Sequence, residues 1–273
     1  MVASGSPPKR PRNRILGALS ARDYDELSSD LELVDHEVRE IVYDIGRPIQ
    51  HVHFVETGVL SIVAVMADGS AVETATVGNE GMLGIPIFLD TDRSATQAFC
   101  QVRGQSLRMR SADFRRHLNA ETKLRSILNR YTQALFTQIA QSAACNRLHA
   151  VRERMARWLL QTHDRVGLDE FSLTQDFMSQ MLGVRRATVT EAAGSLQKDG
   201  LIEYAYGRMR IKNRTGIERA SCECYAIVRS EFDRLLGDRK TASPLDGVKG
   251  SRDGKTTLNN SVPPAGAEAL GDD

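Results

Sequence analysis

The sequence has no long apolar run, and no stretch approaches the roughly 18 consecutive apolar residues that a membrane-spanning helix needs. Residues 1–14 also lack the apolar segment of a secretion signal. These absences argue against a membrane protein or a secreted one, and we expect a cytoplasmic protein with no membrane partner. The 273 residues, 41% of them hydrophobic, suffice for two domains of ordinary size, each with its own core.

Cysteine is scarce. The four thiols, Cys100, Cys145, Cys222 and Cys224, are too few and too scattered for a disulfide framework, and no spacing repeats as metal-ligand pairs do. Cys222 and Cys224 fall in a stretch that we expect to be helical, where side chains two residues apart diverge. We therefore predict reduced, buried thiols rather than a metal site, and no cofactor. The role of Cys222 and Cys224 stays open.

The first part of the chain lacks positive charge. Residues 15–118 hold 9 Lys and Arg against 16 Asp and Glu, whereas residues 185–214 hold 7 basic residues against 3 acidic ones. The acidic part should avoid nucleic acid, because negative charge repels phosphates. A local basic excess is often only a solvated face, so it supports DNA binding only when a motif accompanies it.

The composition divides the chain into five parts. Residues 1–14 and 237–273 are rich in small, polar or proline residues without periodicity, and we expect both ends to be disordered. Residues 15–120 contain short β-prone runs separated by Gly, Asp and Asn, which predicts a β-barrel or sandwich. Residues 121–147 predict one long helix, and residues 148–236 a second domain.

The long helix carries an apolar stripe with steps of three and four residues. The stripe consists of Leu124, Leu128, Tyr131, Leu135 and Ile139. It can pack either on the β-domain or on the same helix of a second subunit, and we favour a homodimer through residues 121–147. Helical spacing continues over residues 148–167, with a break expected at residues 146–147.

Residues 173–198 have the spacing of two helices joined by a tight turn. Thr174 can cap the first helix, and Ser179 is small where the two helices would cross. Gly183 can adopt the positive φ of the turn, and Val189 can fill the space between the helices. The pattern predicts a helix-turn-helix, with an ordinary helical hairpin as the alternative.

Two alternating runs around residues 205–207 follow the second helix, about residues 184–198, and predict a β-wing with one basic face. The helix suits the major groove of double-stranded DNA, and the wing can neutralise flanking phosphates. Arg186 can read a guanine through two hydrogen bonds, and Glu191 can accept one from cytosine. The predicted DNA-binding residues are Arg185, Arg186, Thr188, Thr190, Glu191, Arg208, Arg210 and Lys212.

With these motifs, the chain resembles the cyclic-AMP-receptor and Fnr (Crp/Fnr) family of bacterial transcription regulators over residues 15–236. The resemblance rests on residues 173–212, on the helix Arg154-Met-Ala-Arg-Trp158 and on the order of the parts. It implies an α+β fold with an N-terminal cyclic-nucleotide-binding-like (cupin-like) β-barrel, a long dimerisation helix and a C-terminal winged helix-turn-helix. It also implies a sequence-specific regulator that binds DNA as a homodimer and contacts RNA polymerase.

Two positions depart from the family's recognition helix. Ala187 stands where the family's base-reading glutamate stands, and Glu191 stands where a basic residue is common. The preferred DNA sequence should therefore differ. The iron–sulfur members of the family carry a group of cysteines near the N-terminus, and because this chain has no cysteine before Cys100, such a cluster is not expected.

The resemblance places an effector pocket around residues 78–86 and 93–95. Cyclic-nucleotide binders of the family use Gly-Glu-Leu followed by Arg-Ser/Thr-Ala, but here Ile85 replaces the Glu that holds the ribose, and Arg93-Ser94-Ala95 follows too closely. An apolar residue leaves a ribose hydroxyl unpaired, so cyclic AMP is not expected and a small-molecule effector stays unidentified. The candidate pocket residues are Glu80, Gly81, Gly84, Arg93 and Ser94.

Two other functions compete. His51 and His53 lie two residues apart on an expected strand and point to one face, as in metal-binding cupin-like enzymes, although further ligands are not evident. No catalytic triad, phosphate-binding loop or nucleotide fingerprint stands out, so we expect no enzyme. A sensor that does not bind DNA would lose the basic face provided by Arg186, Arg208 and Arg210.

Overall fold

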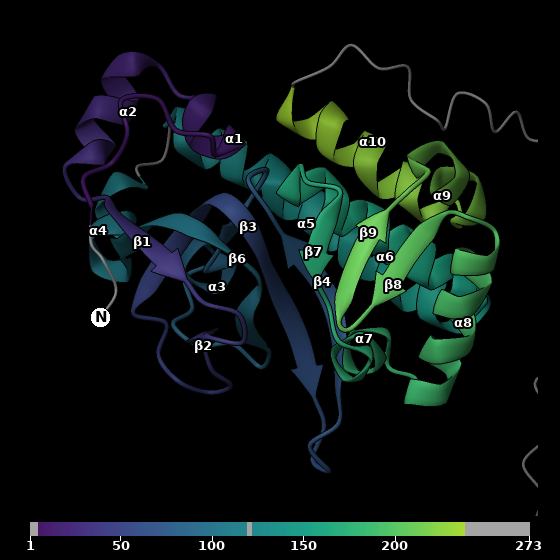
Figure 1. Ribbon diagram of the computed structural model, residues 1–273. Coiled ribbons are helices and arrows are strands. Elements are labelled where there is room, and N and C mark those ends of the chain that lie inside the picture. The colour runs from purple at the N-terminus through teal and green to yellow at the C-terminus, as the bar shows by residue number, and fades with distance from the viewer. Residues whose placement is uncertain (1–4, 119–121, 238–273) are drawn as a thin grey trace, which may run out of the picture.

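The computed structural model describes residues 5–118 and 122–237 (Figure 1). Its N-terminal half contains a sheet of six strands in which β1 (Glu32–His36), β6 (Gln97–Arg110), β3 (His51–Val65) and β4 (Ala71–Val77) are neighbours in that order. The short strands β2 (Ile41–Tyr43) and β5 (Met82–Leu83) pair with β6 and β3, respectively. The sheet is folded like a jelly roll and is not a closed barrel, which refines the predicted architecture.

The long antiparallel strands β3 and β6 approach each other closely at a bulge in their pairing, where only glycine fits. A Cβ on Gly58, whose φ is +80°, would lie 2.5 Å from the carbonyl oxygen of Val102, and one on Gly104 would lie 2.1 Å from that of Thr57. Such a close approach of two backbones explains why glycine occupies both positions, and at Gly58 the positive φ also favours glycine. The bulge bends both strands, which lets one sheet enclose the core.

The N-terminal segment differs from the prediction that residues 1–14 are disordered. Residues 5–14 are ordered rather than disordered, because Gly5 pairs with Leu33 through two backbone hydrogen bonds of 3.1 and 3.0 Å. The buried carboxylate of Glu56 accepts hydrogen bonds from the backbone of Arg12 and Asn13. The Asn13 side chain then caps α1 (Arg14–Gly17). The rest of the predicted disordered ends, residues 1–4 and 238–273, lies outside the described residues.

Helices flank the sheet. The N-terminal half also contains α2 (Ala21–Ser28), α3 (Ile85–Phe88) and α4 (Ser111–His117), and the long helix α5 (Lys123–Leu148) follows. The apolar stripe of α5 packs inside its own chain, because Leu124, Leu128, Tyr131 and Leu135 are buried in the core of the sheet. Ile139, the last member of the stripe, is 37% exposed instead. The helix ends at the His149 cap, two residues beyond the expected break.

The C-terminal half begins with α6 (Val151–Val166), followed by β7 (Glu170–Ser172), α7 (Gln175–Leu182) and α8 (Arg186–Lys198). The strands β8 (Ile202–Ala205) and β9 (Arg208–Ile211) form a three-stranded sheet with β7, in the order β7-β9-β8. Two helices close the described chain, α9 (Arg214–Ala220) and α10 (Cys224–Leu236). The predicted fold class is confirmed: a sheet domain, a long helix and a winged helix-turn-helix.

The two halves share apolar contacts. Val63 and Phe99 of the sheet belong to the same buried cluster as the core of the winged domain, and the rings of Phe99 and Phe177 lie 5.9 Å apart, edge to face. Figure 1 shows α10 running beside α5, and α7 lying close to the β3–β4 hairpin. No helix in the described part of the chain combines the length and the apolar character that a membrane span requires.

Candidate nucleic-acid interface

Local chemistry builds the helix-turn-helix. The Thr174 hydroxyl accepts a hydrogen bond from the backbone of Phe177 and so caps α7, as predicted. Gly183 ends α7 with a φ of +62°, a conformation that disfavours any side chain. Val189 is fully buried between the helices. Helix α8 begins at Arg186, with Arg185 as its N-cap residue, so the recognition helix is two residues shorter than the expected range of 184–198.

One face of α8 is directed to solvent. Arg185, Arg186, Thr190 and Glu191 are exposed and Thr188 is half-buried. Arg186 lies 3.5 Å from the Asp176 carboxylate and donates a hydrogen bond of 3.3 Å to Gln175. These contacts hold the guanidinium at the start of α8, where the first turn of a recognition helix meets base edges in the major groove.

The basic residues of the wing share one exposed face. Arg208, Arg210 and Lys212 alternate with the buried Met209 and Ile211 along and just after β9, as the sequence pattern predicts. Tyr206, at the tip of the wing, is fully exposed. The wing thus presents three cations beside α8, a geometry that suits the phosphates flanking a groove.

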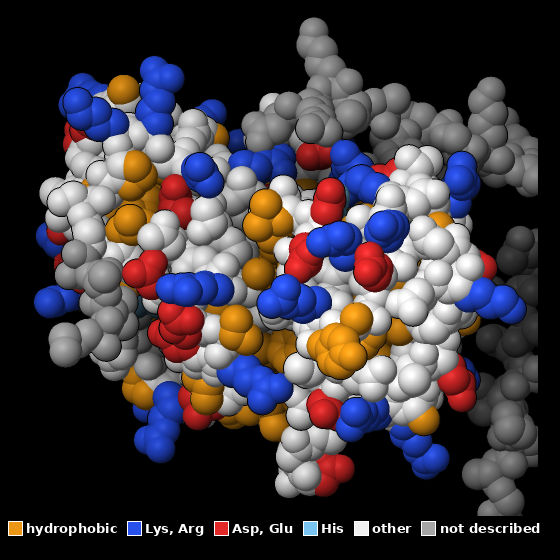
Figure 2. Space-filling view, viewed as in Figure 1, with side chains coloured by type: hydrophobic (Ala, Val, Ile, Leu, Met, Phe, Trp, Pro, Cys, Tyr) orange, Lys and Arg blue, Asp and Glu red, His pale blue; other side chains and the backbone are white. Residues whose placement is uncertain are grey.

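Strand β7 and its acidic residue Glu170 were not predicted from the sequence. Glu170 lies 2.6 Å from the Arg210 guanidinium and 3.7 Å from that of Arg208. The hydrogen bond from Arg210 holds the pKa of the Glu170 carboxyl below its usual value. Figure 2 shows Lys/Arg and Asp/Glu side chains interspersed over this face of the molecule. The wing arginines are therefore partly neutralised by their own chain.

The candidate effector residues each make contacts within the chain. Glu80 is buried and lies 2.7 Å from Arg165 of α6. A Cβ on Gly81 would lie 2.4 Å from the Tyr131 hydroxyl oxygen, so close packing explains this glycine. Arg93 is exposed and donates a hydrogen bond to the carbonyl of Gly46.

The other two effector residues also have local roles. A Cβ on Gly84 would lie 2.8 Å from the Val52 side chain, and Ser94 hydrogen bonds with Thr96. Ile85, which we expect in place of the family's ribose-binding Glu, starts helix α3. Gly84 and Ser94 thus have packing and hydrogen-bond roles within the sheet domain.

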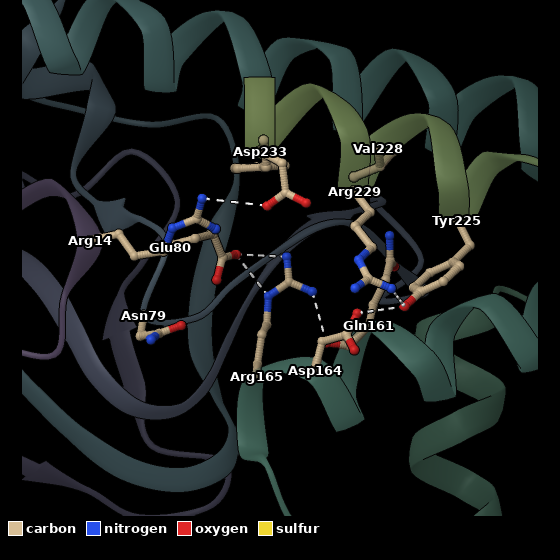
Figure 3. Close-up of a pocket in the computed structure, with 11 residues that line it drawn as sticks. Arg14, Asn79, Glu80, Gln161, Asp164, Arg165, Tyr225, Val228, Arg229 and Asp233 are labelled. Atoms are coloured by element: carbon tan, nitrogen blue, oxygen red, sulfur yellow. Dashed lines mark hydrogen bonds and ion pairs between the residues drawn. The ribbon is translucent and has the colours of Figure 1, made fainter. Parts of the chain in front are cut away.

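A cavity of about 310 Å³ lies where the sheet domain meets α6 and α10 (Figure 3). Of the candidate effector residues, Glu80 lines it. Arg165 points toward Glu80 across the domain boundary, and the Tyr225 hydroxyl donates a hydrogen bond of 2.8 Å to Asp164. Arg14 of α1 lies 3.6 Å from Asp233 of α10. The charged side chains of the cavity thus bridge the two halves of the chain.

A buried hydrogen-bond network also joins the halves. The Trp158 indole of α6 donates a hydrogen bond of 2.8 Å to Glu73 of β4. Ser61 Oγ lies 2.8 Å from Glu73 and 2.7 Å from Gln101, and Gln101 donates to Thr162 of α6. Burial raises the pKa of Glu73 to about 7, although its hydrogen bonds with Ser61 and Trp158 act in the opposite direction.

The histidine pair of the enzyme alternative lies among buried polar groups. His53 Nδ1 is 3.0 Å from Ser106 Oγ, and His36 Nε2 is 2.7 Å from the same oxygen. Burial lowers the pKa of His53 well below its usual value, which keeps the imidazole neutral. Among the described residues, His51 and His53 do not belong to any group of three or more side chains that could hold a metal ion. The contact with Ser106, which also contacts His36, accounts for the conformation of His53.

Two family models match the chain. The cyclic nucleotide-binding domain matches residues 34–121, and the Crp-like helix-turn-helix domain matches residues 153–220. Together they cover more than half of the chain, in the order in which the structure shows the two domains. Among curated proteins, none matches the sequence.

Solved structures of regulators share the fold. FixK2 from Bradyrhizobium japonicum is 16% identical, with a TM-score of 0.60 over 70% of this chain and 98% of that one. TTHB099, a CRP-family transcriptional regulator from Thermus thermophilus, is 19% identical, with a TM-score of 0.58 over 68% and 95%. The c-di-GMP-responsive regulator CLP from Xanthomonas campestris is 13% identical, with a TM-score of 0.57 over 70% and 99%.

The sheet domain, the long helix and the winged helix-turn-helix define a DNA-binding transcription regulator. The chain belongs to the Crp/Fnr family. Members of this family bind DNA and act as dimers, and the family is one of regulators rather than enzymes.

Proposed function

We propose that the protein binds a two-fold symmetric DNA site as a homodimer, with α8 of each subunit in the major groove. The observation that carries this proposal is the exposed polar face of α8 beside the three cations of the wing. In this arrangement Arg186 reads a base, and Arg208, Arg210 and Lys212 contact phosphates. The protein acts in the cytoplasm, where bacterial DNA lies, and the DNA-bound dimer contacts RNA polymerase.

A second face of α5 supports the dimer. Phe136 is 67% exposed and Ile139 is 37% exposed, and Ala140 and Ala143 are exposed on the same side. Steps of three, four and seven residues place these four side chains in one seam, which we call the α5 seam. An exposed apolar seam of this kind is typical of a helix that packs against its symmetry mate.

Selection of bound duplexes from a random pool tests the proposal directly. We expect a palindromic site with half-sites about 10 base pairs apart, centre to centre. Arg186→Ala should reduce discrimination at one base pair of each half-site by about 10-fold, because a bidentate arginine–guanine contact is lost. Arg210→Ala is the matched control, since loss of a phosphate contact weakens all sequences alike. A selected site without symmetry, or two variants with unaltered DNA affinity, would contradict the assignment.

Glu170→Gln should strengthen binding to every duplex by roughly 3- to 10-fold at low salt, because it removes a negative charge close to the phosphates and releases two wing arginines. The gain should shrink as salt rises. Fluorescence anisotropy with specific and scrambled duplexes measures both effects. Glu26→Gln, the same change at a more exposed carboxylate on α2, should leave affinity unaltered. Weaker binding by Glu170→Gln would mean that this carboxylate positions the arginines for DNA.

The effector is proposed to be a small molecule other than cyclic AMP. Ile85 cannot accept a hydrogen bond from a ribose, and Arg93 is directed to solvent, where it contacts Gly46. The cavity lined by Glu80 and Arg165 lies between the sheet domain and the winged domain, so ligand binding there would alter the contact between the two.

A further inference from the structure

Three cysteines and one histidine come together where α5 ends and α10 begins. Cys145 lies in the last turn of α5, and His149 is the residue that caps this helix. Cys222 precedes α10 and Cys224 is its first residue, which corrects the expectation that the two thiols diverge along one helix. The four ligand atoms all lie within 4.8 Å of one another. Over residues 5–118 and 122–237, no other group of three or more side chains satisfies this criterion.

The distances fit a single ion. The sulfurs of Cys145 and Cys222 are 3.5 Å apart, and Cys224 Sγ is 3.5 Å from His149 Nδ1. Around a tetrahedral zinc ion, with bonds of about 2.3 Å to sulfur and about 2.0 Å to nitrogen, neighbouring ligand atoms lie roughly 3.5 to 3.8 Å apart. A disulfide needs sulfurs about 2.05 Å apart. Four ligand atoms this close can surround one metal ion, but they leave no room for an iron–sulfur cluster.

The surroundings of the four side chains complete the pattern of a metal centre. His149 Nε2, the ring nitrogen that faces away from Cys224, lies 3.3 Å from the Glu223 carboxylate. A carboxylate in this position fixes the tautomer that presents Nδ1 as a ligand, and it is the usual outer partner of a metal-bound histidine. Gln141 donates a hydrogen bond of 3.3 Å to Cys224 Sγ. Such a bond stabilises a thiolate.

The thiols are shielded from solvent. Cys145 and Cys224 are fully buried and Cys222 is 6% exposed, and the three form a buried cluster apart from the two large cores. Cys100, the remaining thiol, is buried in β6, away from this cluster. A Cys₃His set with four protein ligands is typical of structural zinc sites, because no position stays open for a substrate.

We propose that Cys145, His149, Cys222 and Cys224 bind one zinc ion, which fastens the end of α5 to the start of α10. Binding displaces the three thiol protons, so that three thiolates and a neutral imidazole surround the ion. Helix α5 carries the α5 seam, and α10 follows the winged domain. The ion therefore holds the DNA-binding half of the chain against the long helix.

Elemental analysis of the full chain, purified under reducing conditions, tests the proposal. We expect one zinc per chain after incubation with zinc chloride and gel filtration. Cys222→Ser should lose the bound zinc, whereas the matched variant Cys100→Ser should keep it. Glu223→Gln, which alters the outer partner of His149, should weaken zinc binding by about 10- to 100-fold.

Two further measurements keep the test decisive where a serine variant fails to fold. His149→Cys should retain one zinc per chain, because four thiolates also form a tetrahedral site. Cobalt chloride added to the metal-free wild-type chain should give the visible absorption of tetrahedral thiolate-bound cobalt. Wild-type protein that stays metal-free while folded, a Cys145–Cys222 disulfide in its place, or iron bound with sulfide would each overturn the proposal.

Discussion

Phe136→Asp is expected to convert the protein into a monomer. Burying one phenylalanine side chain contributes about 1.5 to 3 kcal/mol, and a two-fold interface contains the residue twice. The substitution removes both contributions and adds two negative charges to the α5 seam, so the dimer should dissociate more than about 100-fold more readily. Analytical ultracentrifugation over a range of concentrations measures this change. Binding to a two-half-site duplex should fall with it, because a monomer contacts one half-site and loses the gain in affinity from the linked second subunit.

Leu89→Asp provides the matched control for this variant. Leu89 is 56% exposed, comparable with Phe136, but it lies at the end of α3 in the sheet domain. The same change of an exposed apolar side chain to a carboxylate should leave the dimer intact there. If Phe136→Asp sediments as a dimer with unchanged affinity, the α5 seam is not the interface.

Local signals explain why the winged domain could be predicted so closely. The Thr174 cap and the turn at Gly183 depend on residues a few positions apart, so the sequence itself contains the information. The alternation of Arg208, Met209 and Arg210 likewise fixes which side chains face solvent. The contact of Glu170 with the wing could not be predicted in this way, because its strand has three residues and pairs with a strand 40 residues away.

The stripe on α5 shows where periodicity alone fails. A helix in contact with two partners has two apolar faces, and spacing cannot say which face meets which partner. The stronger stripe, including Leu128 and Leu135, packs on the chain's own sheet, whereas the weaker seam around Phe136 is exposed. The Cys145–Cys222 contact was equally beyond sequence reasoning, because it joins residues 77 positions apart.

The hydrogen-bond network around Glu73 has a consequence for proton uptake. Ser61 Oγ lies close to both Glu73 and Gln101, but a hydroxyl has one hydrogen and cannot donate to both. Gln101 donates to Thr162, so its oxygen is the atom that faces Ser61. The network is satisfied when Glu73 is protonated and donates to Ser61, which then donates to Gln101. This requirement agrees with the pKa of Glu73, which burial raises to about 7.

The folded protein should therefore lose stability as pH rises from about 4.5 to about 7. The unfolded chain ionises Glu73 at the usual carboxyl pKa of 4.5, whereas the folded chain keeps the proton up to about pH 7. The stabilising contribution of the proton is complete below the unfolded pKa and is lost as pH rises through the folded pKa. At about 1.4 kcal/mol for each unit of pKa difference, the loss is of the order of 3 kcal/mol between pH 4.5 and 8.

Glu73→Gln should abolish this dependence, because the amide donates to Ser61 and accepts from Trp158 as the protonated carboxyl does. Urea unfolding at several pH values should show the variant close to wild type at pH 5 and more stable by up to about 3 kcal/mol at pH 8. Glu37→Gln, at an exposed carboxylate, should run parallel to wild type throughout. A constant difference between Glu73→Gln and wild type across this range would mean that Glu73 is ionised in the folded protein. Because Trp158 lies on α6, loss of the Glu73 proton acts directly on the contact between the sheet domain and the DNA-binding domain.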